Sequence, residues 1–270
     1  MGISSPVSGM LASMSYPNSE SVAKARAEWL DSPLGRRVYT LECKLAGDAL
    51  SQVFGWQLLQ IGVWGRDNRL ADAARTQRKA LISSESVEFY SSVGVIRSRL
   101  DGLPIASDSI DAVLMPHTLE QVSSPHEVLR EVARILLADG QLILFGFRPF
   151  STWGVRNLLA ASGLPPGTER YFSEHRIRDW LQLLGFEVIE ARRYLFTLPF
   201  GSAEPRVQRF LENTGSKLWP LFAGAYMLRA RKRLYSVTPI RPRKWVRTPV
   251  VGGLIETGTR MQSALNPSDK

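Results

Sequence analysis

The spacing of apolar positions changes twice between residues 100 and 154. Residues 109–115 form a short apolar run of the kind found in buried parallel strands. Apolar residues then recur at helical spacing over residues 128–136, and residues 141–147 form a second apolar run. Strand, helix and strand joined by short loops predict a right-handed βαβ crossover. Ligands of such sheets bind beyond the carboxyl ends of the strands, so we expect a site there.

The predicted crossover helix has recognisable end signals. Ser124 can cap its N-terminus, Pro125 suits its first position, and Glu127 completes a capping box with Ser124. Gly140 suits the C-terminal end of the helix. We therefore expect this helix to fill most of the chain between the two strands.

The rest of the chain alternates in the same way between strand and helix patterns. Further strands are predicted at residues 57–61, 79–83, 93–97, 186–191 and 224–232. Further helices are predicted at residues 23–30, 35–54, 154–159, 173–184 and 205–218. This order predicts a single α/β domain with a doubly wound, Rossmann-like sheet of seven strands, without an internal repeat or a second core.

The same reading divides the chain into four segments. Residues 1–20 are rich in Ser, Pro, Gly and Met without periodicity, and we expect them to be disordered. Residues 21–56 are expected to form a helical cover, residues 57–235 the Rossmann-like domain, and residues 236–270 a basic C-terminal tail.

Composition limits the class of protein. The single cysteine, Cys43, excludes an internal disulfide and a cysteine-rich zinc site. No apolar run approaches the roughly 20 residues that a membrane helix needs. The N-terminus lacks the pattern of a signal peptide, so we expect a cytoplasmic location.

The net charge of +9 is concentrated near the C-terminus. Eight basic residues lie between positions 229 and 247 without an intervening acid, and the remainder of the chain is close to neutral. We interpret this as a solvated, flexible tail. The alternative is contact with nucleic acid or an anionic membrane, for which charge is the only support.

One stretch of the sequence also carries a family resemblance. LPIASDSIDAVLMPHTLEQVSSPHEVLREVARILLADGQL resembles the core of type 11 class I methyltransferases, which use S-adenosylmethionine. LQIG, MPHTLE, GFRPFSTWG and KRLYSVTPIR resemble a branch of small proteobacterial proteins identified as methyltransferases, over about residues 29–241. The resemblance implies a class I sheet whose last strand is antiparallel, S-adenosylmethionine as cofactor, and a small-molecule acceptor.

The resemblance further implies that the loop after the first strand contacts the methionine moiety. Glycines there let the backbone approach the ligand. Gly62 is in register with the family, Gln60 replaces an expected acid, Trp64 takes the place of a glycine, and Gly65 is out of step. Trp64 either closes over the pocket or fills it, and the sequence does not choose between these readings.

Other implied contacts depart from the family pattern. Glu85 is the nearest candidate for the acid that bonds the ribose, although an exposed turn glutamate is an equal reading. Arg99 stands where an acid usually contacts adenine, so we expect backbone groups around Leu100 to do so. Pro116 opens the loop after the fourth strand, at the mouth of the expected site.

His117 and Glu120 are the candidate catalytic residues. A base is needed only when the acceptor must lose a proton, and the unperturbed pKa of histidine is about 6.5. His117 is the best candidate base, and packing alone is the other reading. Glu120 would orient His117, contact the acceptor, or merely stabilise the turn. Gln121 takes the histidine position of related quinone O-methyltransferases, and three scattered histidines offer no metal spacing, so no metal is expected.

These readings leave three functional hypotheses. The first is S-adenosylmethionine-dependent methyl transfer to a small-molecule or lipid-like acceptor, with Phe150 and Trp153 lining an apolar pocket or packing on the sheet. The second is a binding or regulatory protein on the same fold without catalysis, suggested by Gln60, Arg99 and the single in-register glycine. The third, nucleic-acid methylation, lacks an NPPY-type tetrapeptide at residues 115–118 and ranks below the others.

Overall fold

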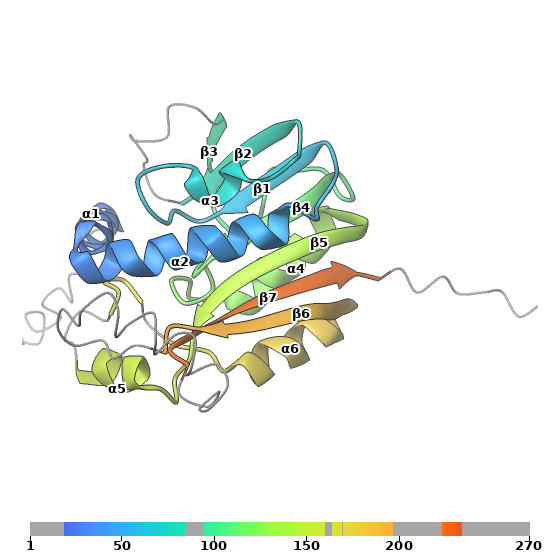
Figure 1. Ribbon diagram of the computed structural model, residues 1–270. Helices are drawn as coiled ribbons and strands as arrows, with labels where there is room; N and C mark the ends of the chain where they lie inside the picture. The colour runs from blue at the N-terminus through green and yellow to red at the C-terminus, as the bar shows by residue number, and fades with distance from the viewer. Residues whose placement is uncertain (1–18, 85–93, 160–163, 169, 197–222, 234–270) are drawn as a thin grey trace, which may run out of the picture. The chain divides into compact units, whose positions relative to one another are not determined.

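The computed structural model describes residues 19–84, 94–159, 164–168, 170–196 and 223–233, all within one compact unit of residues 1–235 (Figure 1). The helices are α1 (Ser19–Asp31), α2 (Pro33–Leu50), α3 (Arg69–Asp72), α4 (Pro125–Ile135), α5 (Thr152–Leu159) and α6 (Glu174–Leu183). The strands are β1 (Gln57–Ile61), β2 (Arg78–Ser83), β3 (Gly94–Arg97), β4 (Ile110–Pro116), β5 (Leu136–Phe147), β6 (Phe186–Tyr194) and β7 (Ala225–Lys232). The helix predicted at residues 205–218 and the predicted disordered and tail segments lie outside the described residues, apart from Ser19 and Glu20, which begin α1.

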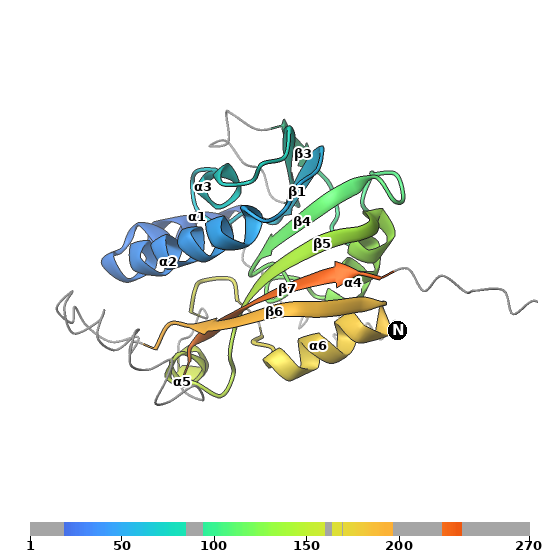
Figure 2. The same ribbon diagram turned by 45° about the vertical axis from the view of Figure 1, so that its right-hand side comes forward.

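The seven strands form one sheet in the order β3-β2-β1-β4-β5-β7-β6. The pairs from β3 to β5 are parallel, whereas β7 lies between β5 and β6 and is antiparallel to both (Figure 2). The predicted α/β fold with a doubly wound sheet and an antiparallel last strand is therefore confirmed. The carboxyl ends of the parallel strands share one edge of the sheet, where the candidate residues gather.

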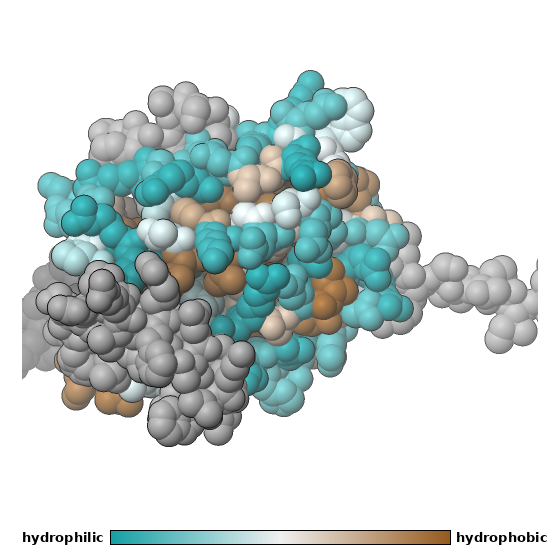
Figure 3. All heavy atoms as spheres, in the orientation of Figure 1, coloured by the Kyte–Doolittle hydropathy of each residue, from teal (hydrophilic) through white to brown (hydrophobic). Residues whose placement is uncertain are grey.

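Each face of the sheet buries its own apolar cluster. Helices α4 and α6 pack on one face through Val128, Leu129, Val132, Ile177 and Leu181. Helices α2 and α3 pack on the other face, and α2 runs across the front of the sheet in Figure 1. The near side of the molecule is largely hydrophilic in Figure 3, because α2 turns its polar residues outward. None of the described helices is long and apolar enough to cross a membrane.

Helix α2 buries a charged residue in its packed face. The helix begins where the Ser32 hydroxyl accepts a hydrogen bond from the Gly35 amide at 3.1 Å. The buried positions are Gly35, Val38, Tyr39, Glu42, Ala46, Ala49 and Leu50. The predicted stripe included Leu41 and Leu45, which are only partly buried. The helix is thus rotated relative to the prediction, and this rotation directs the Glu42 carboxylate toward the sheet.

The crossover helix differs from its prediction at both ends. Ser124 stands at the N-cap of α4, but its side chain makes no capping hydrogen bond. The helix ends at Ile135, and β5 begins at once because Leu136 pairs with Ile110 of β4. The prediction that Gly140 ends the helix is therefore wrong. Gly140 lies within β5, because the chain joins the sheet from Leu136 onward.

Half of the basic segment belongs to the sheet. Arg229, Arg231 and Lys232 lie in β7 and Arg233 follows it. Each has an acidic partner on a neighbouring element, such as Asp108 at 2.7 Å from Lys232. These charges are therefore largely neutralised within the fold, and the basic residues from 241 to 247 lie outside the described part of the chain.

Candidate functional site

The loop after β1 has the backbone geometry that demands glycine. Gly62 has a φ of +87° and its amide donates to the Ile82 carbonyl at 2.8 Å. A Cβ at Gly62 would come within 2.7 Å of the Thr118 hydroxyl oxygen. The side-chain amide of Gln60 donates from Nε2 to the Gly62 carbonyl at 3.1 Å. Gln60, which replaces the expected acid, therefore stabilises the conformation of the loop through its side chain.

The Trp64 side chain, which belongs to this loop, packs between helix α2 and His117. It is fully buried, and its indole Nε1 donates to Glu42 Oε2 at 2.5 Å. Gly65 has a φ of +91° and lies against the ring of Tyr39, where a Cβ would clash. In this conformation helix α2 clamps the loop through Tyr39 and Glu42. Both readings of the role of Trp64 toward a ligand stay predictions.

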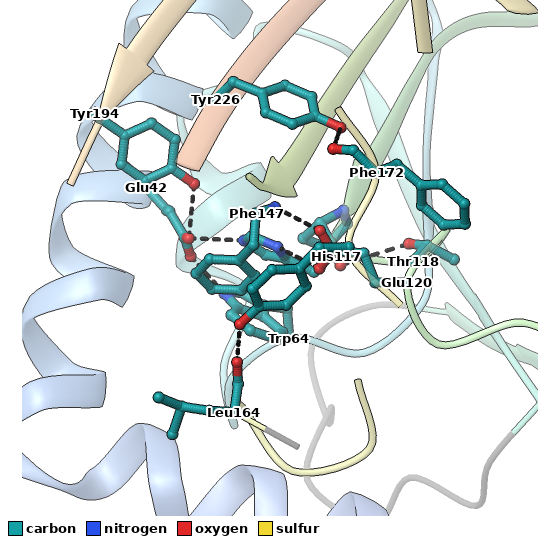
Figure 4. A network of polar contacts seen from close by, with 12 residues as sticks. Glu42, Trp64, His117, Thr118, Glu120, Phe147, Leu164, Phe172, Tyr194 and Tyr226 are labelled. Carbon is teal, nitrogen blue, oxygen red and sulfur yellow. Dashed lines mark hydrogen bonds and ion pairs between the residues drawn. The ribbon is translucent and has the colours of Figure 1, made fainter. Parts of the chain in front are cut away.

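His117 lies at the centre of a buried polar network (Figure 4). Its Nε2 is 2.8 Å from Glu42 Oε1 and its Nδ1 is 3.1 Å from Glu120 Oε2. Each ring nitrogen faces a carboxylate oxygen, an arrangement that an imidazolium satisfies by donating a proton from both nitrogens. His117 has a φ of +53°, an unfavourable backbone conformation for a residue with a Cβ. Such strain persists only where the surroundings fix it.

The electrostatics agree with this assignment. Burial lowers the pKa of His117, but Glu42 and Glu120 raise it by more, so that it reaches about 9. Burial raises the pKa of Glu120, and the charge of His117 opposes that rise. The second oxygen of Glu120 accepts a hydrogen bond from the Phe147 amide. The two carboxylates thus favour the charged form of the ring between helix α2 and the carboxyl end of β4.

Aromatic rings close the network from the remaining sides. The ring centroids of Trp64 and Phe147 lie 4.3 and 4.2 Å from that of His117. Tyr194 donates to Glu42 Oε1 at 2.9 Å, and Trp153 stacks on Phe147. His117 has no exposed surface in this conformation. Action as a base would require one carboxylate to withdraw, so its catalytic role stays a prediction.

A cavity of about 340 Å³ opens beside this network at the same edge of the sheet. Its lining consists of Ser84, Arg99, Leu100, Asp101, Gln121, Val122, Ser123, Ser124 and Val128. Arg99 forms an ion pair with Asp101 at 2.6 Å, and Leu100 is buried. The Gln121 Nε2 atom is buried and has no hydrogen-bond partner within the described part of the chain. The mixture of polar and apolar side chains suits a ligand that has both kinds of surface.

The structure divides the predicted site residues into two neighbouring groups. The group around the network consists of Gln60, Gly62, Trp64, Gly65, Pro116, His117 and Glu120. Arg99 and Leu100 lie in the cavity, whereas Glu85 lies outside the described residues. Of the predicted aromatic lining, Trp153 is fully buried but Phe150 is 85% exposed. Among the described residues, no group of histidine, cysteine and acidic side chains could hold a metal.

Two residues of the site were not predicted. Glu42 is bonded to His117, Trp64 and Tyr194, and its signal in the sequence is a carboxylate between Val38 and Ala46 in an apolar stripe. Gln121 was noted only as a replacement for a metal-linked histidine. Its role as a cavity donor depends on which side chains surround it, and the sequence carries no signal for that.

Comparison with known proteins gives consistent matches. Residues 62–144 match the profile of the type 11 methyltransferase family, described as a methyltransferase domain. The uncharacterised protein YafS of Escherichia coli strain K12 is 30% identical over 167 residues, covering 62% of this chain and 67% of that protein. The chain spans about two thirds of the length of the curated relatives it matches.

Solved structures share the fold at low sequence identity. An S-adenosylmethionine-dependent methyltransferase from Archaeoglobus fulgidus matches with a TM-score of 0.54 and 14% identity, covering 73% of this chain and 94% of that one. An S-adenosylmethionine-dependent methyltransferase from Thermotoga maritima matches with a TM-score of 0.53 and 20% identity, covering 78% and 100%. At these identities the matches show the fold alone.

Proposed function

Since this chain belongs to the type 11 methyltransferase family, we propose that it transfers the methyl group of S-adenosylmethionine to a small-molecule or lipid-like acceptor. S-adenosylmethionine is the cofactor of that family, and its sulfonium supplies an already activated methyl group. The protein then needs chiefly to hold the two reactants in line, which alone can supply most of the rate. The residues at the carboxyl edge of the sheet are suited to this task.

The observation that supports cofactor binding most directly is the cavity beside β4. Its walls combine apolar side chains, Leu100 and Val128, with the polar groups of Asp101 and Gln121. This mixture fits the adenosine part of the cofactor, which has an apolar ring face and polar edges. A rotation of the Gln121 side chain toward the cavity would give its Nε2 atom, which has no acceptor among the described residues, an acceptor on the ligand. We assign Gln121 to adenosine binding on this ground.

The backbone of the loop at Gly62 suits the methionine end of the cofactor, whereas the side chains beside the loop do not. Gly62 keeps the left-handed conformation that a close backbone approach requires. Trp64, Glu42 and His117 occupy the space next to it in this conformation. The methionine end of the cofactor would therefore have to bind beside Trp64 or displace it.

The packing of Trp64, Glu42 and His117 beside this loop favours a second candidate function. A protein whose network stays closed would keep the fold and the adenosine cavity but would not bind the methionine end of the cofactor. The chain would then act as a binding or regulatory protein without methyl transfer. The two candidates differ in one measurable property, which is affinity for the complete cofactor.

Calorimetric titration with S-adenosylmethionine and S-adenosylhomocysteine tests the proposal. We expect dissociation constants on the order of micromolar. Absence of binding up to about millimolar concentration would contradict methyl transfer and leave the second candidate. Binding of adenosine alone, without the complete cofactor, would favour the second candidate directly.

The variant Gln121→Leu tests the assignment of the cavity. It removes the unpaired donor at similar size, so we expect unchanged or greater thermal stability of the free protein. Affinity for S-adenosylhomocysteine should fall about tenfold, because the ligand acceptor loses its partner. Gln182→Leu, on the exposed side of α6, is the matched control and should leave affinity unchanged. Equal affinities in the two variants would refute the role of Gln121.

A further inference from the structure

Helix α5 carries an apolar face that is exposed at the surface of the protein. Val155, Leu158 and Leu159 are spaced three and four positions apart, so their side chains share one side of the helix. They are 61%, 88% and 80% exposed, and Phe150, just before the helix, is exposed to a similar extent. The apolar spheres at the lower left of Figure 3 lie where α5 is drawn in Figure 1. We call these four side chains the α5 patch.

The opposite side of α5 is held against the rest of the fold. Trp153 is fully buried, and its ring stacks on that of Phe147 with 5.9 Å between the ring centroids. Asn157 Oδ1 accepts a hydrogen bond from the Leu164 amide at 2.6 Å, which ties the helix to the segment that follows it. The apolar face is therefore presented by an anchored helix, and its side chains are directed outward because Trp153 occupies the inner side.

The helix also lies beside the candidate site. The Phe147 ring, on which Trp153 stacks, itself stacks on His117 with 4.2 Å between the ring centroids. Phe150 lines a cavity of about 320 Å³ at the carboxyl end of β5. Ligands of sheets of this kind bind beyond the carboxyl ends of the strands. A surface that contacts the α5 patch would thus lie next to the edge of the sheet at which an acceptor enters.

The composition of the patch favours a lipid surface over a protein partner. A specific protein interface uses roughly 20 residues on each side and carries hydrogen bonds. The α5 patch consists of four side chains without polar atoms, and leucine and valine are under-represented among the residues that dominate protein interfaces. Binding to a bilayer scales with the buried apolar area and needs no matching partner surface. The net charge of +9 further favours an anionic bilayer.

We propose that the α5 patch inserts into the interface of an anionic membrane and holds the protein at its surface. The carbon atoms of the four side chains are comparable in number to those of one acyl chain, which alone gives weak and reversible membrane binding. The use of this surface to collect a lipid-like acceptor rests on the proposed methyl transfer, whereas membrane binding itself can be measured without it.

Cosedimentation of the full chain with vesicles of phosphatidylcholine and phosphatidylglycerol tests this proposal. We expect half of the protein to be bound at a lipid concentration on the order of 0.1–1 mM. The double variant Leu158→Ser/Leu159→Ser should bind at least about tenfold more weakly, because it removes apolar contact without changing the charge.

Leu183→Ser is the matched control. Leu183 is 85% exposed, as the leucines of the patch are, but it ends α6 at the opposite edge of the sheet, where β6 begins. Vesicle binding of this variant should stay within about twofold of the parent protein. Equal weakening in Leu183→Ser and in the double variant would overturn the assignment to α5.

Three further results would overturn the proposal. The first is no vesicle binding by the parent protein up to about 10 mM lipid. The second is equal binding by the parent and the double variant that about 1 M salt abolishes, since such salt screens exposed charges beyond about 3 Å and the binding would then belong to basic residues. The third is dimerisation of the parent in sedimentation velocity that the double variant loses, because the patch would then bind a second copy of the chain.

Thermal unfolding separates an exposed patch from one that is covered within the chain. Substitutions at exposed positions leave stability nearly unchanged, so the double variant and Leu183→Ser should melt at the temperature of the parent protein. A lower melting temperature in the double variant alone would show that another segment of the chain packs on the patch, and this would overturn the proposal.

Cofactor titration of the same variants separates this surface from the proposed function. Weaker vesicle binding by the double variant, with unchanged affinity for S-adenosylhomocysteine, would support the α5 patch. Failure of the parent protein to bind the cofactor, with vesicle binding that depends on Leu158 and Leu159, would contradict methyl transfer and still support the patch. Cofactor binding without vesicle binding would contradict the patch alone.

Discussion

Replacement of Glu42 by glutamine tests whether His117 is a buried cation. The new side-chain amide can keep its oxygen toward the Trp64 indole and turn its NH2 group toward His117 Nε2, at the place of the 2.8 Å contact. A neutral His117 then accepts from this amide and donates to Glu120. Glu42→Gln therefore removes the charge and keeps the hydrogen bonds to Trp64 and His117, whereas the Tyr194 hydroxyl loses its acceptor at Oε1, a cost that is the same across this pH range.

The expected magnitude follows from the pKa of His117. A rise from 6.5 to about 9 corresponds to on the order of 3 kcal/mol, at about 1.4 kcal/mol per unit. Because the folded pKa exceeds the unfolded one, this stabilisation is complete below about pH 6.5 and is lost as the pH rises through about 9. With one carboxylate removed, burial of the ring is opposed by Glu120 alone, and the pKa falls. Glu42→Gln should therefore cost on the order of 3 kcal/mol near pH 6 and much less near pH 9.

Urea unfolding followed by tryptophan fluorescence measures this cost at each pH. The control is Asp48→Asn, an exposed position on the same helix that pairs with Arg192 at 2.9 Å. It should cost less than about 1 kcal/mol at each pH in this range. Taking the difference between the parent and Glu42→Gln cancels the titrating groups that do not interact with Glu42. An equal cost of Glu42→Gln near pH 6 and near pH 9 would refute the buried imidazolium, as would an NMR titration that places the His117 pKa below about 6.5 in the parent protein.

Three further predictions concern single features of the chain. Gly62→Ala should cost about 2 kcal/mol in unfolding free energy, since its φ of +87° strains alanine and the Cβ meets Thr118; urea unfolding measures this, and an unchanged midpoint would contradict it. Burial raises the pKa of the Cys43 thiol to about 11. A disulfide reagent should therefore react with Cys43 at pH 8 roughly 100-fold more slowly than with a thiol of pKa 9.0. Equal reaction rates before and after unfolding would contradict the buried thiol. A chain that ends at Tyr235, the end of its compact unit, should bind S-adenosylhomocysteine within about twofold of the full chain; a tenfold loss would place residues 236–270 in the site.

The order of elements was accessible from the sequence because it depends on local periodicity. The apolar run at residues 109–115 became β4, shifted by one residue, and the helical spacing from Val128 to Ile135 became the packed face of α4. The ends of elements were less accessible. Gly140 marked a helix end by its residue type, but pairing of Leu136 with Ile110 drew that segment into β5. Long-range pairing thus overrode a local end signal.

The position of the site was likewise predicted from chain order. Strands that run parallel bring their following loops to one edge, and this placed Gly62 and His117 near each other before any contact was known. The contact between Glu120 and His117 was also accessible, since the two lie three residues apart in one loop. A glycine at position 62 was expected only from the family resemblance. The structure supplies the physical reason, because a Cβ at this position would clash with Thr118.

The sequence by itself therefore determined the fold, the strand ends that form the site, and the local pair of His117 and Glu120. Only the tertiary structure brought a second carboxylate to His117, because Glu42 lies 75 positions away and reaches the ring by the rotation of α2. It also decided which side chains from separate elements, Arg99 and Gln121 among them, line the cavity beside β4. Periodicity is a property of neighbouring residues, whereas charge state and pocket composition depend on burial and on side chains that packing brings together from distant parts of the chain.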